Sequence, residues 1–257
     1  MPASGPRPTV VVTGAAGGVG RLLLPSLGGF DVRATDRVDG PGTVVGDLAD
    51  PAFTAVVTAG ADAVVHLAGT PDPGASWARL RTPNADVVDT VLAAAVANGV
   101  GRVVLASSMH AVGGHVDSGL KAVREDAPAY PCCAYGAAKV LAESLARVYH
   151  DQWGLSVVCL RLGGVRDRPV ATSWLPGWLS PGDLGRLVVA ALRADVGYGV
   201  YHGVSANTGT SWDTSLARAQ LGYHPVDDSA SFADGLRDDT VALDPDARPR
   251  WGRLHLS

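Results

Sequence analysis

A glycine-rich loop near the N-terminus constrains the fold of this chain more than any other feature of its sequence. Residues 9–20 read TVVVTGAAGGVG, which places Gly14, Gly17 and Gly20 in a G-x-x-G-x-x-G pattern between an apolar run and a helical pattern. Loops of this kind let the backbone approach a pyrophosphate, which the N–H groups of the following helix can bind. An ordinary turn is the alternative in a chain with 32 glycines. The position at the first strand–helix junction favours the dinucleotide site.

The apolar pattern predicts a parallel sheet with helices on both faces. Short Val- and Leu-rich runs alternate with longer Ala- and Leu-rich segments, which is typical of strand–helix–strand units. We expect strands at Thr9–Thr13, Asp31–Thr35, Thr43–Val45, Ala63–Leu67, Arg102–Ala106 and Ser156–Leu160. We expect helices at Val19–Leu27, Pro51–Ala59, Asn84–Asn98 and Tyr135–Trp153. The expected fold class is α/β, a doubly wound parallel sheet of the Rossmann type with a small C-terminal substrate-binding region.

Composition excludes several classes of function. With 47% hydrophobic residues, 18% charged residues and a net charge of -4, the chain is neither disordered nor suited to a nucleic-acid partner. Its longest apolar stretches fall far short of the roughly 20 residues that span a bilayer, so we expect no membrane partner. The N-terminal segment lacks the apolar core of a signal peptide, and we expect a cytoplasmic protein.

Histidine and cysteine give no sign of a metal site in the sequence. The cysteines Cys132, Cys133 and Cys159 include no CxxC pair, and His110 and His115 lack acidic or cysteine companions at ligand spacing. We interpret the cysteines as reduced thiols that fill space, and we expect no bound metal.

Asp36 indicates which dinucleotide the loop binds. It follows Gly14 by 22 residues, where a carboxylate can accept hydrogen bonds from the adenosine ribose of NAD. The 2′-phosphate of NADP would meet a like charge, which Arg37 offsets only in part, so NADP is the less favoured cofactor. A solvated turn acid is the alternative. Further cofactor contacts are expected at the carboxyl edge of the sheet, from Ala16, Gly18, Val19, Asp47, Leu48, Leu67, Ala68, Gly69 and Ala106.

The texture of the chain changes after Leu162 to a Gly-, Pro-, Trp- and Arg-rich segment with weaker periodicity. Within it we expect a helix at Pro181–Ala194, a strand at Val200–Val204 and a helix at Trp212–Leu221 that ends at Gly222. We interpret residues 1–257 as a single NAD(P)-binding domain, in which residues 163–257 contribute most of the substrate-binding region.

The strongest chemical signal is a tyrosine and a lysine four residues apart. Tyr135 and Lys139 (YGAAK) begin a long helical pattern and share one helical face, in a chain that has only two lysines. A phenol has a pKa of about 10, and a neighbouring ammonium and an oxidised nicotinamide both favour its ionised form. Ser108, just after the expected fifth strand, would hold a substrate oxygen while Tyr135 transfers its proton. An ordinary surface pair on an amphipathic helix is the alternative.

Together these residues resemble the short-chain dehydrogenase/reductase superfamily, in its extended branch of NAD-dependent epimerases and dehydratases. The resemblance runs through TGAAGGVG, Asp36, GDLAD, HLAG, Asn84, ASS and YGAAK, in the family's order. It implies a Rossmann fold, bound NAD and a catalytic triad of Ser108, Tyr135 and Lys139. It also implies that Asn84 lies on the cofactor side and supports the lysine through a water molecule.

A nearer resemblance is to the uronate dehydrogenase group, which oxidises the anomeric hydroxyl of hexuronic acids. It rests on RVVLASSMHAVG, YGAAKVLAESLARVYHDQWG, LRLGG, GVSANTGTSWD and LGYHPVDD. It implies substrate contacts from Ser76, Ser108, Met109, His110, Tyr135 and Ser173. Two of these depart from the group, since Met109 stands where an asparagine is typical and Ser173 where an arginine holds the substrate carboxylate. Arg166 or Arg168 can take over from that arginine, or both can be surface charges.

The expected function is that of an NAD-dependent oxidoreductase that takes a hydride from a hydroxyl of a sugar acid or a similar small polar ring. Two alternatives stay open, a sugar epimerase that retains its NAD and a dinucleotide-binding protein without turnover. The resemblance also implies a homodimer, formed through the helices Asn84–Asn98 and Tyr135–Trp153. A small-molecule substrate and a second copy of the chain are thus the expected partners.

Overall fold

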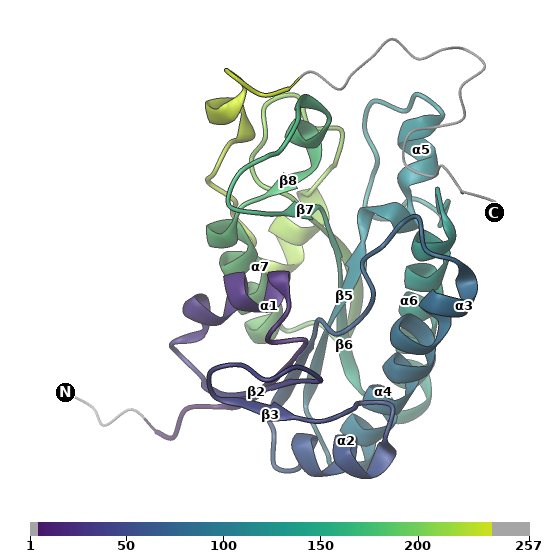
Figure 1. Cartoon of the computed structure of the whole chain (residues 1–257), viewed down its shortest axis with the longest axis vertical. Coiled ribbons are helices and arrows are strands. Elements are labelled where there is room, and N and C mark those ends of the chain that lie inside the picture. Colours follow the sequence, from purple (N-terminus) through teal and green to yellow (C-terminus); the bar gives the residue numbers. More distant parts are fainter. Residues whose placement is uncertain (1–4, 238–257) are drawn as a thin grey trace.

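The computed structural model describes residues 5–237 and contains a sheet of seven parallel strands (Figure 1). The strand order is β3-β2-β1-β4-β5-β6-β9. The bounds are β1 (Thr9–Thr13), β2 (Asp31–Asp36), β3 (Thr43–Val45), β4 (Ala63–His66), β5 (Arg102–Ser108), β6 (Ser156–Leu162) and β9 (Tyr198–Gly203). The order runs outward from β1 and then from β4, so the winding reverses between these two strands, where ligands bind in open α/β sheets. The doubly wound fold class is confirmed.

Helices cover both faces of the sheet (Figure 1). On one face lie α1 (Gly18–Leu23) and α7 (Pro181–Arg193), and on the other lie α2 (Pro51–Thr58), α4 (Val87–Ala97) and α6 (Ala134–Trp153). The alternation of side chains along β1 explains the two layers. Val10 and Val12 belong to the core cluster of α1 and α7, whereas Val11 belongs to that of α2, α4 and α6. This central strand is therefore apolar on both sides, as its sequence predicts.

Short elements complete the carboxyl edge of the sheet. They are the helices α3 (Trp77–Arg81) and α5 (Gly113–Asp117), and the two-stranded sheet of β7 (Gly164–Val165) and β8 (Trp178–Leu179). Single turns are the 3-10 segments Leu24–Leu27, Met109–Ala111, Thr172–Gly177 and Ser229–Phe232 and the π turns Thr82–Asp86 and Ala217–Leu221. Among residues 5–237, no helix has both the length and the apolar content needed to cross a membrane.

The predicted elements appear in the expected order, and the differences lie at their ends. The predicted helix Asn84–Asn98 is wrong at its start, because the π turn Thr82–Asp86 connects α3 to α4 there. Strand β5 runs two residues past its predicted end, since it stays paired with β6 as far as Ser108 and Leu162.

The predicted helix Trp212–Leu221 is wrong over its first part. Trp212 instead forms an isolated bridge with Val123 and packs in a small buried cluster with it and Met109. Tertiary packing of this indole therefore overrides the local helical pattern. The predicted end is confirmed, because Gly222 closes the following π turn with a φ of 70°. Of the predicted substrate-binding region, residues 163–257, the part from residue 238 onward lies outside the described residues.

A buried network ties α6 to the middle of the sheet. Arg161 of β6 donates from Nε and Nη2 to the two carboxylate oxygens of Glu143 at 2.9 and 2.8 Å, with both side chains almost wholly buried. Ser107 at the end of β5 donates its hydroxyl to the same carboxylate at 2.5 Å. Arg161 also donates to the Glu125 carbonyl at 3.2 Å, and the Glu125 carboxylate accepts from the backbone N–H groups of His202, Leu216 and Ala217. The network joins α6, β5, β6 and the C-terminal segment behind the carboxyl edge.

Replacing Glu143 by Gln is expected to lower the free energy of unfolding by roughly 3–5 kcal/mol, because the Arg161 guanidinium then stays charged and uncompensated in the interior. Asp151→Asn on the same helix is the matched control. It breaks the exposed pair of Arg147 and Asp151 and should cost less than about 1 kcal/mol. Urea denaturation followed by circular dichroism measures both, and equal losses in the two variants would contradict the assignment.

Candidate active site

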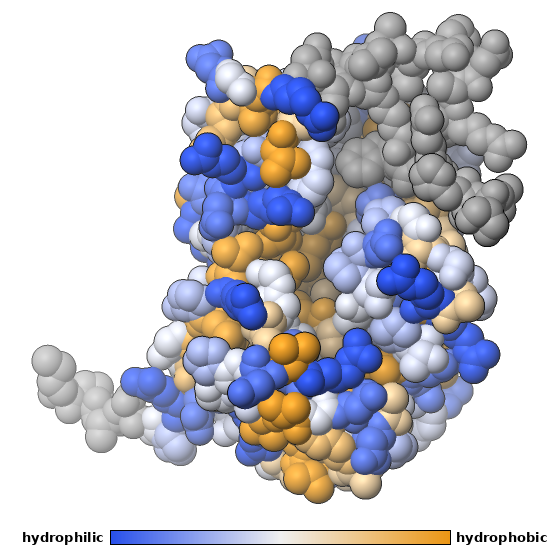
Figure 2. Space-filling model, in the orientation of Figure 1, coloured by the Kyte–Doolittle hydropathy of each residue, from blue (hydrophilic) through white to orange (hydrophobic). Residues whose placement is uncertain are grey.

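A continuous cavity of about 1590 Å³ opens at the carboxyl ends of β1, β4, β5 and β6. The glycine loop and Asp36 line one end of it, and Met109, Trp174 and Trp212 line the other. Figure 2 shows the hollow, with apolar side chains on its walls. Pockets for a single small ligand measure about 300–1,000 Å³. The cavity therefore has room for a dinucleotide and a small substrate together.

The glycine loop is built for close approach of backbone to ligand. Gly14 has a φ of 68°, and a Cβ added there would lie 2.7 Å from the Ala68 backbone nitrogen. A Cβ at Gly20 would lie 2.4 Å from the Gly14 carbonyl oxygen. Gly17 and Gly18 line the cavity at the start of α1, where no side chain of residues 5–237 caps the first N–H groups of the helix. Those N–H groups are free to face an anion, as a pyrophosphate site requires.

Asp36 is fixed in the position that a ribose-binding carboxylate needs. Its Oδ2 accepts from the Ala16 N–H at 3.0 Å, and its Oδ1 accepts from the Val38 N–H at 3.2 Å. The side chain lines the cavity beside Arg37. Ala16 itself does not line the cavity and acts through its N–H group. The other predicted cofactor residues that line this half are Val19, Asp47, Leu48, Leu67, Ala68, Gly69 and Ala106.

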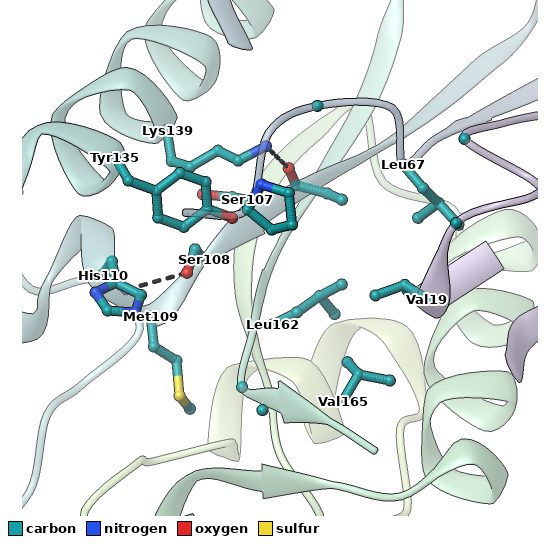
Figure 3. A pocket seen from close by; sticks show the side chains of 18 of the residues that line it. Val19, Leu67, Ser107, Ser108, Met109, His110, Tyr135, Lys139, Leu162 and Val165 are labelled. Atoms are coloured by element: carbon teal, nitrogen blue, oxygen red, sulfur yellow. Dashed lines mark hydrogen bonds between the residues drawn. The ribbon is translucent and has the colours of Figure 1, made fainter. Parts of the chain in front are cut away.

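Ser108, Tyr135 and Lys139 meet in the middle of the cavity (Figure 3). Ser108 ends β5, while Tyr135 and Lys139 lie in the first two turns of α6. Tyr135 lies close enough to Ser108 for that hydroxyl to act on the pKa of the phenol. The Lys139 Nζ donates to the Ala106 carbonyl at 2.9 Å and lies 5.6 Å from the centroid of the Tyr135 ring. The structure thus brings together the three residues that the sequence singled out.

Burial sets the ionisation of these groups. It raises the pKa of Tyr135 to about 12, although the nearby Ser108 hydroxyl acts to lower that pKa. Burial also lowers the pKa of Lys139 to about 8, against the raising effect of the Glu143 carboxylate. The expected ionised form of Tyr135 is therefore not favoured in the chain alone, because desolvation of the phenolate outweighs the ammonium. Burial, followed by the charge of Lys139, lowers the pKa of His66 to about 3, so this side chain is neutral.

Asn84 lies behind the cavity rather than in its lining. Its amide donates to the carbonyls of Thr70 and Leu80 at 3.3 and 3.2 Å. Its Oδ1 is buried and, among the described residues, has no hydrogen-bond partner. A Cβ added at Gly69 would lie 2.7 Å from this oxygen and 3.7 Å from the Lys139 Nζ. Only glycine at position 69 leaves the space between the amide oxygen and the ammonium open.

The substrate end of the cavity holds most, but not all, of the predicted residues. Met109, His110 and Ser173 line it, together with Arg166 and Arg168. Ser76 does not line it, because this exposed residue precedes the first turn of α3. Sequence reasoning missed several lining residues, of which Leu162, Val165, Cys132 and Trp212 are examples.

The residues that sequence reasoning missed differ in whether the sequence carries a signal that could have identified them. Leu162 and Val165 belong to the LRLGG segment and its continuation, directly after a predicted strand, so the rule that ligands bind at carboxyl ends was enough to find them. Trp212 comes 50 residues after Leu162, and no local signal places it there. Cys132 belongs to a pair of thiols at the edge of the cavity. Hydrogen bonds with the Cys132 thiol, with His110 and with the Gly136 N–H lower the pKa of Cys133.

Residues 10–165 match the NAD dependent epimerase/dehydratase family, and the chain belongs to this family. It is 34% identical over 248 residues to the NAD-dependent glucose-6-phosphate dehydrogenase of Haloferax volcanii, covering 87% of this chain and 95% of that protein. It is 33% identical over 233 residues to the uronate dehydrogenase of Pseudomonas putida, covering 87% and 85%.

Solved structures agree with the sequence relatives. A tyrosine-to-alanine variant of uronate dehydrogenase from Agrobacterium tumefaciens, complexed with NAD, has a TM-score of 0.79 at 31% identity and covers 88% of this chain and 87% of that one. The chain is thus an NAD-dependent oxidoreductase of the extended short-chain type. The glycine cradle and the fixed carboxylate of Asp36 fit NAD as the cofactor, which confirms the prediction.

Asp36→Asn is expected to reduce the preference for NAD over NADP by roughly tenfold or more, because the amide oxygen can still accept from Ala16 while the charge that repels a 2′-phosphate is gone. Arg37→Ala is the matched control and should shift the preference in the opposite direction. The measurement is the ratio of kcat/KM for the two cofactors. An unchanged ratio in Asp36→Asn would show that another group selects the cofactor.

Proposed function

We propose that the chain is a dehydrogenase that oxidises the anomeric hydroxyl of a sugar acid or of a similarly small anionic sugar. The observation that carries the proposal is the meeting of Ser108, Tyr135 and Lys139 inside a cavity that also accommodates a dinucleotide. The named relatives support the substrate class, since one is a uronate dehydrogenase and another acts on glucose 6-phosphate. Both substrates are anionic hexose derivatives.

In the proposed reaction, each of the three side chains has a different role in the transfer of one proton. Ser108 holds the oxygen of the reacting hydroxyl by a hydrogen bond, beside Tyr135. Tyr135 removes the proton of that hydroxyl as general base. Lys139, held by the Ala106 carbonyl, keeps a positive charge 5.6 Å from the Tyr135 ring and stabilises the phenolate. NAD, when bound, supplies the hydride acceptor and a further positive charge that favours the phenolate.

Two arginines at the rim fit an anionic substrate. Arg166 and Arg168 both line the cavity, and the Arg166 guanidinium lies 5.3 Å from the centroid of the Trp174 ring. Stacking on an indole restricts the guanidinium and leaves its N–H groups available for an anion. Asp167 lies between them and also lines the cavity, so the rim carries one net positive charge. We propose that Arg166 and Arg168 take over from the arginine that Ser173 replaces.

The proposal extends to the assembly and location of the protein. We propose that the chain forms a single domain, in which residues 163–257 contribute most of the substrate-binding region. We also propose that the protein is a homodimer and that it is located in the cytoplasm. Leu141 and Val148 are exposed on α6, and α6 packs beside α4 on one face of the sheet. Two such helices from each copy can form a four-helix interface.

Sedimentation velocity should give the mass of two chains, and the mass of one chain would contradict the homodimer.

Tyr135→Phe is expected to lower kcat for uronate oxidation by at least ~100-fold, because the phenol oxygen that is proposed to take the proton is removed. Binding of NAD, measured by calorimetry, should stay within about threefold of the wild-type value, since the phenol ring is retained. In the wild-type enzyme the rate of oxidation should rise with pH, because the base must be deprotonated. Full activity in Tyr135→Phe would exclude the proposed base.

Arg168→Gln and Arg166→Gln are each expected to raise KM for glucuronate or galacturonate by roughly tenfold, because a charge-assisted hydrogen bond to the carboxylate is lost. Turnover of the neutral parent sugars should not change. Arg79→Gln, which removes an exposed arginine outside the cavity, serves as the control. Equal effects on neutral and acidic sugars would show that the arginines do not bind the carboxylate.

A further inference from the structure

His110, Cys132 and Cys133 bring a ring nitrogen and two sulfur atoms together at the edge of the cavity. The His110 Nδ1 lies 3.2 Å from the Cys132 Sγ and 3.5 Å from the Cys133 Sγ, and the three ligand atoms all lie within 4.8 Å of one another. A tetrahedral Zn²⁺, with Zn–S near 2.3 Å and Zn–N near 2.0–2.1 Å, separates its ligand atoms by about 3.5–3.8 Å. The two nitrogen–sulfur distances are already close to this spacing.

The local backbone holds this cluster in place. The Cys132 N–H donates to the His110 carbonyl at 3.2 Å, which joins the two segments. Gly113 makes room for a thiol, because a Cβ added there would lie 2.7 Å from the Cys132 Sγ. Cys133 is the N-cap of α6, and its Sγ accepts from the Gly136 N–H at 3.4 Å. A donor at the start of a helix favours the thiolate, which is the form that binds metal ions.

We propose that His110, Cys132 and Cys133 bind a thiophilic divalent cation such as Zn²⁺. Two thiolates and one imidazole are a preferred ligand set for zinc, and they leave one position of the tetrahedron open. His110 and Cys132 line the cavity, so the open position faces the substrate end.

The position of the cluster gives the cation a consequence for activity. The His110 ring packs edge-on against Tyr135, with 5.6 Å between the ring centroids. A cation held by His110 therefore occupies space beside Tyr135 and withdraws the imidazole from a substrate. We expect Zn²⁺ to inhibit the enzyme in competition with the sugar and not with NAD. This consequence rests on the proposed function, whereas the binding of the cation does not.

Binding is tested on the reduced, full-length protein by competition for Zn²⁺ with a chromogenic chelator. The wild-type chain should bind one Zn²⁺, and Cys132→Ala should weaken the affinity by roughly 100-fold or more, because one of three protein ligands is lost. Cys159→Ala is the matched control, since this thiol is buried in the sheet core, away from the cluster. Equal affinities in Cys132→Ala and Cys159→Ala, or no binding to the wild-type chain, would overturn the proposal.

Two further measurements complete the test. The first needs no variant, so misfolding cannot affect it, and the second separates failure of the metal site from failure of the proposed function. Co²⁺ added to the wild-type protein should give the thiolate charge-transfer absorption and the intense visible bands of a tetrahedral site. A Co²⁺ spectrum without the thiolate absorption would overturn the site with no variant needed. Inhibition is measured as the factor by which Zn²⁺ lowers the rate of uronate oxidation. This factor should be at least ~10-fold smaller in Cys132→Ala than in Cys159→Ala. Tight Zn²⁺ binding to a chain that never reduces NAD would leave the site intact and remove only the proposed function.

Discussion

The packing of one face of α6 against the end of β5 is the interaction on which the site depends. Tyr135, Lys139 and Glu143 follow one another at intervals of four residues and reach three consecutive residues of β5, Ala106–Ser108. The helix repeat of 3.6 residues brings the three side chains to one face. Because each of the three contacts is polar and buried, a shift of the helix along the strand would leave several groups unpaired at once. This register therefore aligns the proposed base with the proposed substrate oxygen.

The same packing decides the charges at the site. Lys139 is buried, yet its ammonium is supported by the Ala106 carbonyl and by the carboxylate of Glu143. Glu143 in turn is held by Arg161 and Ser107, so its charge is compensated inside the protein. A positive group thus stands beside a neutral phenol, and both side chains are buried. In the proposed mechanism, the nicotinamide charge of bound NAD would add to that of Lys139 in favour of the phenolate, which would couple cofactor binding to the ionisation of Tyr135.

Local patterns were enough to predict the fold and to single out most of the residues that line the glycine-loop end of the cavity. Gly14, Asp36 and the Tyr135–Lys139 pair each need a specific residue for a local physical reason, and the structure places all of them on the cavity. Residues that act through distant contacts were not predictable in this way. Trp212 reaches the cavity only because it pairs with Val123. The cluster at His110 joins thiols that come 22 and 23 residues later in the chain, so the sequence spacing gave no sign of it.

The most direct test of the account is to follow the hydrogen itself, with glucuronate or galacturonate that carries deuterium at the anomeric carbon. If the anomeric hydroxyl is oxidised, the deuterium must appear in the reduced NAD, and the rate must fall when bond breaking limits turnover. The account predicts deuterated NADH in equal amount to the oxidised sugar, and loss of this product in Tyr135→Phe. Reduced NAD without deuterium, or no reduction with either sugar acid, would contradict it.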